Sequence, residues 1–419
     1  MAVIKTLLVK TLMTNPLVIG KALLYRVLCA LIILGSIQYQ AFAAVLPEDR
    51  ADFAFHSYEG DNSEFRGPSV LIRKQFANRA SIWANYYVDM NSAASVDVET
   101  QGSAYTEERT EISGGIDFLH DRTLLSLSVT NSSENDYEAD SIAFSLSQEF
   151  FGDLSTLSLS YSTGEDEVYQ NVRDADRNIV DRTLEGEATH QRFSLGWTQI
   201  MTKSWILSLN AEASVDEGFL RNPYRSARAL NNDNFTSIPE LYPTTRNSQA
   251  YAIKSMYYLP YRAAIQLEYR VFNDSWDIEA SNYQIKYIHP FGKHWITELR
   301  VRAYEQTQAE FYSDFLEFLP NEEQLQTLIR ASDKELGTYD NITLGFALSY
   351  EVETKWLSWF DKVSVNFAYD RVSTSYDNFS DKRLGQAVNE NDGRLFPIGT
   401  EPAFSFDADI VRMFLSFWY

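Results

Sequence analysis

Apolar and polar residues alternate with a period of two along most of the chain after residue 50. A β-strand places successive side chains on opposite faces, so each alternating segment predicts a strand with one apolar and one polar face. The segments run for about 9–15 residues, which suits a tilted membrane-spanning strand better than the ~5–6 residues of a typical soluble strand. Clear examples centre on Leu127, Phe144, Leu159, Leu267, Phe346 and Val365.

Short turns alternate with longer polar segments, which lie at 91–107, 131–138, 164–187, 215–246, 308–336 and 376–405. Outer-membrane barrels have short periplasmic turns and long outer loops. We therefore predict an all-β protein, a single transmembrane antiparallel up-and-down β-barrel of about 16 strands that begins with a weak strand at 52–58. Fourteen strands is the alternative, because the first hairpin and the turn at 273–275 are poorly defined.

The last eleven residues predict a final strand with one apolar face. Steps of two back from the C-terminus give only apolar residues, whereas the other parity is mixed and contains Arg412. Such a strand resembles the terminal strand by which the insertion machinery of Gram-negative bacteria recognises barrels. The candidate assembly signal consists of Val411, Met413, Leu415, Phe417 and Tyr419.

The first 43 residues have the pattern of a secretion signal. They contain no acidic residue, and an apolar run from 27 to 37 is followed by Ala41, Phe42 and Ala43, which fit a cleavage site. We expect a cleaved signal peptide at 1–43 and a barrel at 44–419. Cys29, the only cysteine, lies inside the signal, so the mature chain has no disulfide.

Composition narrows the class of partner. The chain has 58 acidic and 36 basic residues and a formal net charge of −22, and so acidic a surface repels nucleic acid. Aromatic residues make up 14% of the chain, and many stand near the short turns, as expected of the girdles at a membrane interface. The expected surroundings are outer-membrane lipid and lipopolysaccharide.

The segment at 216–225 differs from the other long segments because it combines apolar residues with arginines. One interpretation is a loop folded into the barrel, with Arg221, Arg225 and Arg228 lining a constriction for an anionic solute. The other is a structured loop whose arginines pair with nearby acidic residues. Both remain open from the sequence.

A second group of charges falls on the polar parity of the predicted strands, facing the lumen. Mixed charges in this position can set the selectivity of a pore. They can equally form a salt-bridged lattice that stiffens or fills the lumen. These candidates are Glu268, Arg270, Glu298, Arg300, Arg302 and Arg412.

No catalytic, cofactor or metal site is predicted. The five histidines do not form a metal motif, and neither a nucleophile elbow nor a phosphate loop is present. Acidic clusters near 134–140 and 165–167 are interpreted as solvated faces, although divalent cations could bridge them to lipopolysaccharide.

Several stretches resemble a family of proteobacterial outer-membrane proteins known only as a domain of unknown function. They lie at 67–74, 84–89, 92–95, 105–111, 216–225, 258–264, 311–314 and 333–336. The resemblance implies an outer-membrane barrel and no catalytic residue. Members of this family tend to be encoded beside a small lipoprotein, a thioredoxin-like protein and a flavin transferase, which implies a link to periplasmic redox proteins.

Two functions from different classes follow. The first is a passive channel or transporter for a small solute in the outer membrane of a Gram-negative bacterium, because about sixteen strands enclose more volume than side chains readily fill. The second is a structural or docking barrel that holds periplasmic or surface partners of an envelope system, such as the lipoprotein and redox proteins. Neither function is enzymatic.

The signal peptide gives the first testable prediction. N-terminal sequencing of protein extracted from outer membranes should start at Ala44, because cleavage is expected after Ala43. Full-length protein that starts at Met1 in the inner-membrane fraction would contradict both the signal and the topology.

Overall fold

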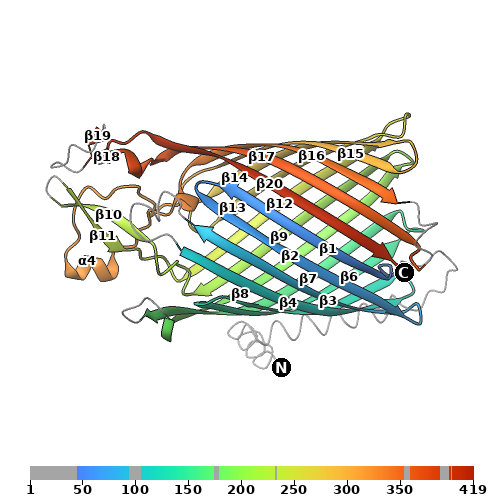
Figure 1. Ribbon diagram of the computed structural model, residues 1–419, viewed down its shortest axis with the longest axis horizontal. Coiled ribbons are helices and arrows are strands. Elements are labelled where there is room, and N and C mark those ends of the chain that lie inside the picture. Colours follow the sequence, from blue (N-terminus) through green and yellow to red (C-terminus); the bar gives the residue numbers. More distant parts are fainter. Residues whose placement is uncertain are drawn as a thin grey trace, which may run out of the picture. The chain divides into compact units, whose positions relative to one another are not determined.

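The computed structural model describes residues 45–93, 105–173, 179–231, 234–352, 359–386, 396–397 and 399–419. Within these residues, sixteen strands form one closed antiparallel barrel (Figure 1). The predicted fold class and strand number are therefore confirmed, and the fourteen-strand alternative is wrong. The expected signal peptide at 1–43 lies outside the described residues, so its cleavage stays a prediction.

Each barrel strand pairs with its neighbours in sequence order, except where short loop strands intervene. The barrel strands are β1 (Arg50–Gly60), β2 (Ser63–Phe76), β3 (Ala80–Ala93), β4 (Tyr105–His120), β5 (Thr123–Ser133), β6 (Tyr137–Phe150), β7 (Ser155–Arg173), β8 (Ile179–Thr202), β9 (Trp205–Gly218), β12 (Thr245–Tyr258), β13 (Ala264–Asp274), β14 (Glu279–Phe291), β15 (Trp295–Gln306), β16 (Tyr339–Val352), β17 (Lys362–Ser380) and β20 (Ala403–Trp418).

The remaining described elements are short and lie in the long loops. They gather at the end of the barrel opposite the C-terminus (Figure 1). None of the helices in the described part of the chain is long and apolar enough to cross a bilayer. The loop elements are β10 (Ser226–Asn231), β11 (Asn234–Pro239), α4 (Glu322–Thr327), η1 (Lys334–Leu336), η3 (Lys382–Leu384), β18 (Gly385–Gln386) and β19 (Phe396–Pro397).

The first and last strands close the ring. β1 pairs with β20 over its whole length, from Arg50 opposite Trp418 to Gly60 opposite Ala408. The weak first strand predicted at 52–58 is therefore real and extends at both ends. Although its apolar–polar alternation is weak, this strand is stabilised by backbone hydrogen bonds to both neighbouring strands.

The odd parity of β20 faces outward, as predicted. Met413 is 50% exposed and Leu415 is 36% exposed, while Phe417 packs edge-on against Phe53 of the neighbouring strand. Large exposed apolar residues continue around the ring on the matching parity of the other strands, for example Leu127 on β5 and Leu344 on β16. This continuous apolar exterior is the lipid-facing belt of a membrane barrel. Recognition of the last strand as an assembly signal stays a prediction.

Of the segments predicted as loops, one is mostly strand and another is only a tight turn. Residues 164–187 mostly extend the hairpin of β7 and β8, which have 19 and 24 residues, and 131–138 is a tight turn between β5 and β6. Their polar side chains suggested loops because both faces of a strand become polar once it leaves the membrane. Strand pairing continues there through backbone hydrogen bonds, which do not depend on apolar side chains.

Charged side chains end the apolar belt on the side of the long loops. On β17 and β20, Arg371 Nη1 lies 2.5 Å from Asp409 Oδ2 and Arg371 Nη2 lies 2.8 Å from Asp407 Oδ2. These residues share the outward parity of Tyr369 and Val411. The outer limit of the hydrocarbon layer therefore lies below them, because unhydrated charges on the lipid face are costly.

The parity of β5 can be tested with adjacent substitutions. Leu127→Arg places a charge on the lipid face, where a midplane arginine costs about 2–4 kcal/mol, and should lower the amount of folded barrel. Ser128→Arg, one residue away, faces the lumen and should be tolerated. Heat-dependent gel mobility of the two purified variants measures this difference, and equal loss of folded protein would show that the assignment of faces is wrong.

Candidate functional site

The inner face of the barrel divides into two unlike walls. On β5 to β8 the inward positions are mostly small and hydroxylated, and they include Ser128, Ser145, Ser158, Ser160 and Ser194. On β12 to β20 many inward positions are charged, among them Lys254, Arg302 and Asp370. Small side chains on one side leave space that large charged side chains on the other side do not fill.

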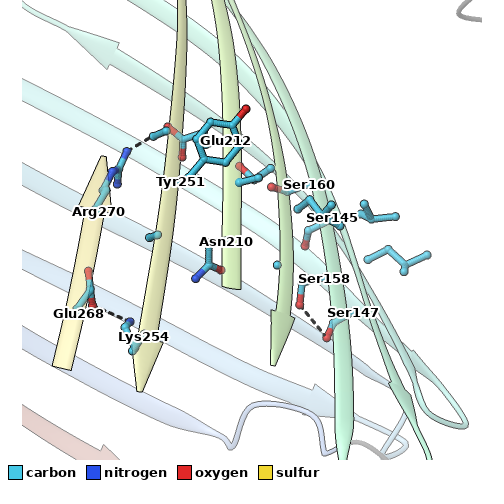
Figure 2. A pocket seen from close by; sticks show the side chains of 18 residues that line it. Ser145, Ser147, Ser158, Ser160, Asn210, Glu212, Tyr251, Lys254, Glu268 and Arg270 are labelled. Carbon is cyan, nitrogen blue, oxygen red and sulfur yellow. Dashed lines mark hydrogen bonds and ion pairs between the residues drawn. The ribbon is translucent and has the colours of Figure 1, made fainter. Parts of the chain in front are cut away.

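A cavity of about 570 Å³ lies against the small-residue wall. Figure 2 shows serines on one side, charged side chains of β9, β12 and β13 on the other, and Asn210 between them. Glu268 and Arg270, two of the candidate pore residues, line this cavity. The cavity also borders Glu212 and Lys254.

The charges beside the cavity form two local groups. Lys254 Nζ lies 3.2 Å from Glu268 Oε2, a direct pair between neighbouring strands. Glu212 instead forms long ion pairs with two arginines. Arg192 Nε and Arg270 Nη2 each lie 3.7 Å from its Oε1 atom. The side chains of Arg192 and Arg270 remain 62% and 45% exposed, so both guanidinium groups are accessible from the lumen.

Three other candidate residues belong to one ion-pair chain on the opposite wall. Arg300 and Arg412 both contact Asp370, and Arg300 Nη1 lies 3.6 Å from Glu298 Oε1. Arg300 reaches Asp370 across β16 because Gly345 stands between them, where a Cβ would lie 2.2 Å from Asp370 Oδ1. Glu298 also lies 3.2 Å from Lys286 Nζ. The lattice interpretation therefore describes this wall.

Arg302 is held differently from the other lumen arginines. Its Nε donates a 2.5 Å hydrogen bond to Asn282 Oδ1, and its guanidinium lies 5.5 Å from the ring centre of Tyr304. Its contacts thus come from an amide and an aromatic ring, and its positive charge is not cancelled by them. The structure places Arg302 and Arg270 on either side of Asn282.

Three loops form a cap at the outer end of the barrel. They connect β9 to β12, β15 to β16 and β17 to β20, and short β-bridges pair Ala229 with Leu316 and Leu241 with Arg330. Packed apolar clusters add to these contacts, with Tyr242, Trp276 and Tyr312 in the largest. The described parts of these loops therefore form one packed cap.

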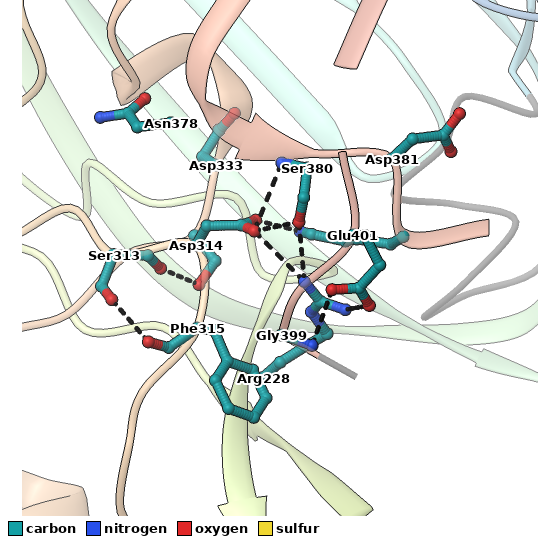
Figure 3. Close-up of polar contacts among 12 residues, drawn as sticks. Arg228, Ser313, Asp314, Phe315, Asp333, Asn378, Ser380, Asp381, Gly399 and Glu401 are labelled. Atoms are coloured by element: carbon teal, nitrogen blue, oxygen red, sulfur yellow. Dashed lines mark hydrogen bonds and ion pairs between the residues drawn. The ribbon is translucent and has the colours of Figure 1, made fainter. Parts of the chain in front are cut away.

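Arg228 is the central contact of the cap (Figure 3). Its guanidinium Nη1 lies 2.8 Å from Glu401 Oε1, and its Nη2 lies 3.2 Å from both Asp314 Oδ2 and Ser380 Oγ. Asp314 and Glu401 belong to the other two loops, and Ser380 is the last residue of β17. The Arg228 side chain is only 2% exposed, which gives it a structural part in the cap.

The other two arginines of this loop are also engaged in the cap. Arg221 donates to the Glu240 backbone oxygen, and Arg225 Nη1 lies 2.8 Å from Asp333 Oδ1. Burial raises the pKa of Asp333 to about 7, although Arg225 opposes this rise. Burial also raises the pKa of Glu240, whose carboxylate accepts a 2.7 Å hydrogen bond from the Ser332 backbone. A constriction lined by Arg221, Arg225 and Arg228 stays a prediction.

The family model described as protein of unknown function (DUF3570) matches residues 94–375. The chain belongs to this family. The match runs from just after β3 into β17, so the resemblance suggested by the sequence is confirmed. Two of the stretches that suggested it, 67–74 and 84–89, precede the match.

No curated protein matches the chain. Among solved structures, a bacterial polysaccharide outer membrane secretin has a TM-score of 0.47 and 6% identity, covering 89% of this chain and 100% of that chain. The siderophore receptor PirA from Pseudomonas aeruginosa gives 0.41 and 7%, covering 89% of this chain, which spans only 63% of the receptor. The CymD monoaromatic hydrocarbon channel gives 0.40 and 8%, covering 89% of both chains. Likeness at this level carries no information on function.

Several lumen residues of this DUF3570 barrel were not predicted from the sequence. Arg192, Glu212 and Asp370 are inward charges that the strand parity could have indicated. His190 lies 2.8 Å from both Asp166 and Asp216, and this group could not be found because its members come from three strands. Within the described residues, no group of three or more His, Cys, Asp or Glu side chains is placed to hold a metal ion.

Replacing Arg228 should loosen the cap and leave the barrel folded. Arg228→Met leaves Glu401 and Asp314 without their buried partner, a change that typically costs about 3–5 kcal/mol. Limited proteolysis or hydrogen exchange should show faster opening at 311–316 and 380–386, with unchanged heat-dependent gel mobility. Arg383→Met is the matched control, since its pair with Asp381 is more exposed and worth at most about 1 kcal/mol. Equal effects of both substitutions would contradict the role of Arg228.

Proposed function

We propose that the protein is a passive outer-membrane channel for small polar solutes, with its outer mouth narrowed by the three-loop cap. The observation that carries this proposal is the cavity of about 570 Å³ beside a hydroxylated wall inside a closed sixteen-strand barrel. A polar interior suits water and hydrated solutes, and the apolar exterior suits lipid. The same architecture supports an outer-membrane location.

The charged wall supports a channel more than a filled barrel. One ion-pair chain runs along the wall from β14 to β20, and one of its contacts crosses β16. It joins Arg412, Asp370, Arg300, Glu298 and Lys286. Side chains paired in this way stiffen the sheet and leave the opposite wall uncovered. The pore-selectivity and lattice interpretations therefore apply to different residues, with Arg270 beside the cavity and Arg300 in the lattice.

The cap favours a second candidate function, a docking barrel. Its loops are held together by Arg228 and joined to the β1–β2 turn through Lys334 and Asp61, so it offers a fixed surface. Tyr224 is 58% exposed and Phe318 is 48% exposed, as expected of a contact surface for another protein. Partners of an envelope redox system, such as a small lipoprotein, belong to this alternative.

Planar-bilayer recording distinguishes the two. The purified barrel should conduct in potassium chloride, and Ser160→Trp, which places a large ring in the cavity, should reduce the conductance. Phe144→Trp is the matched control, because Phe144 on the neighbouring strand β6 faces lipid, is 46% exposed and does not line the cavity. A folded wild-type barrel without conductance would refute the channel and leave the docking function. Equal conductance of the two variants would show that the path lies elsewhere.

A further inference from the structure

On the side of the lumen formed by β8 to β20, the charge balance is opposite to that of the whole chain. The chain carries a formal net charge of −22. In the described residues of β8 to β20, however, the central inward positions hold more cations than carboxylates. The cations are Arg192, Lys254, Arg270, Lys286, Arg300, Arg302 and Arg412, and the carboxylates are Glu212, Glu268, Glu298 and Asp370.

Arg270 and Glu212 line the cavity, and Arg192 lies beside it through its contact with Glu212. Glu212 is shared by Arg192 and Arg270, and 3.7 Å is too long for a direct hydrogen bond in either pair. Arg302 adds a guanidinium held by an amide and a ring. Guanidinium groups offer paired donors that match the oxygens of a carboxylate or a phosphate.

The other side of the cavity offers a different chemistry. Serine hydroxyls from three adjacent strands and the Asn210 amide face the space opposite Arg270 (Figure 2). A hydroxyl both donates and accepts hydrogen bonds, so such a wall pairs with the hydroxyl groups of a solute without requiring a charge. The cavity volume falls within the ~300–1,000 Å³ of small-molecule sites.

We propose that this cavity is a binding site for a small hydroxylated organic anion of the sugar-acid or sugar-phosphate class. Arg192 and Arg270 bind the anionic group, and the serine wall with Asn210 binds the hydroxyls. Glu212 holds the two arginines in place and lowers their net charge, which keeps the binding weak enough for release. The proposal rests on the channel function for the path by which the solute enters.

The first test is block of the ionic current by four probes at equal concentration. Glucuronate should block more strongly than glucose, acetate or glucosamine, and glucose 6-phosphate should block like glucuronate. The double variant Arg192→Gln with Arg270→Gln should weaken the glucuronate block roughly fivefold or more, since even one charge at contact distance in water accounts for about that factor. Glu212→Gln should strengthen the block, because it releases both arginines.

Arg66→Gln is the matched control. Arg66 lies on the outward parity of β2, pairs with Glu64 at 3.1 Å and is 55% exposed, so its loss should not change the block. Heat-dependent gel mobility verifies that each variant is folded. A glucose block as strong as that of glucuronate would refute the role of the arginines. An acetate block as strong would refute the role of the hydroxyl wall.

A second measurement separates failure of the site from failure of the channel. Saturation-transfer NMR on the detergent-solubilised barrel detects weak binding whether or not the barrel conducts. Glucuronate signals that are lost in the double arginine variant would support the site even for a non-conducting barrel, in which case only the channel fails. A conducting barrel with no glucuronate signal, or with a signal unchanged in the double variant, would overturn the site and leave the channel intact.

Discussion

Hydrogen bonding between β1 and β20 is the constraint on which the rest of the structure depends. It removes both free edges of the sheet, so the backbone groups of every barrel strand have partners in the hydrocarbon layer. Closure also fixes the parity of all strands together, since a slip by one residue would exchange the two faces of a strand. The lipid-facing belt and the polar lumen are thus two results of one register.

The chemistry of the inward side chains changes from strand to strand around the lumen. Serine positions on β6 to β8 contribute little volume, and the cavity lies against them. Charged positions on β13 to β20 contribute large side chains that pair across strands, as Arg300 does with Asp370. Gly345 is essential to that geometry, because a side chain there would occupy the space between the two groups.

Sequence periodicity predicted the strands and the faces of their residues, but it missed side-chain contacts between residues far apart in the sequence. The parity of the last strand and the inward position of Arg270 follow from a period of two, and both are seen. The partners of Arg228 could not be predicted, because Asp314 and Glu401 lie 86 and 173 residues away. The shared carboxylate of Glu212 was missed for the same reason, as each pair joins different strands. Strand extensions beyond the membrane were missed because polar residues there no longer alternate with apolar ones.

The charged group of Arg371, Asp407 and Asp409 on the outward face has a consequence for how the barrel sits in the bilayer. Four successive outward positions of β17 below Arg371, from Val363 to Tyr369, are apolar or aromatic, and the charges begin immediately above them. If the barrel sank or tilted by two residues on this side, the charges would enter hydrocarbon at a cost that rises steeply with depth. Local thinning of the bilayer, or snorkelling of the Arg371 side chain, would lower this cost. These charges therefore limit how deeply this side of the barrel can enter the bilayer, and they hold the mouth and its cap above the lipid surface.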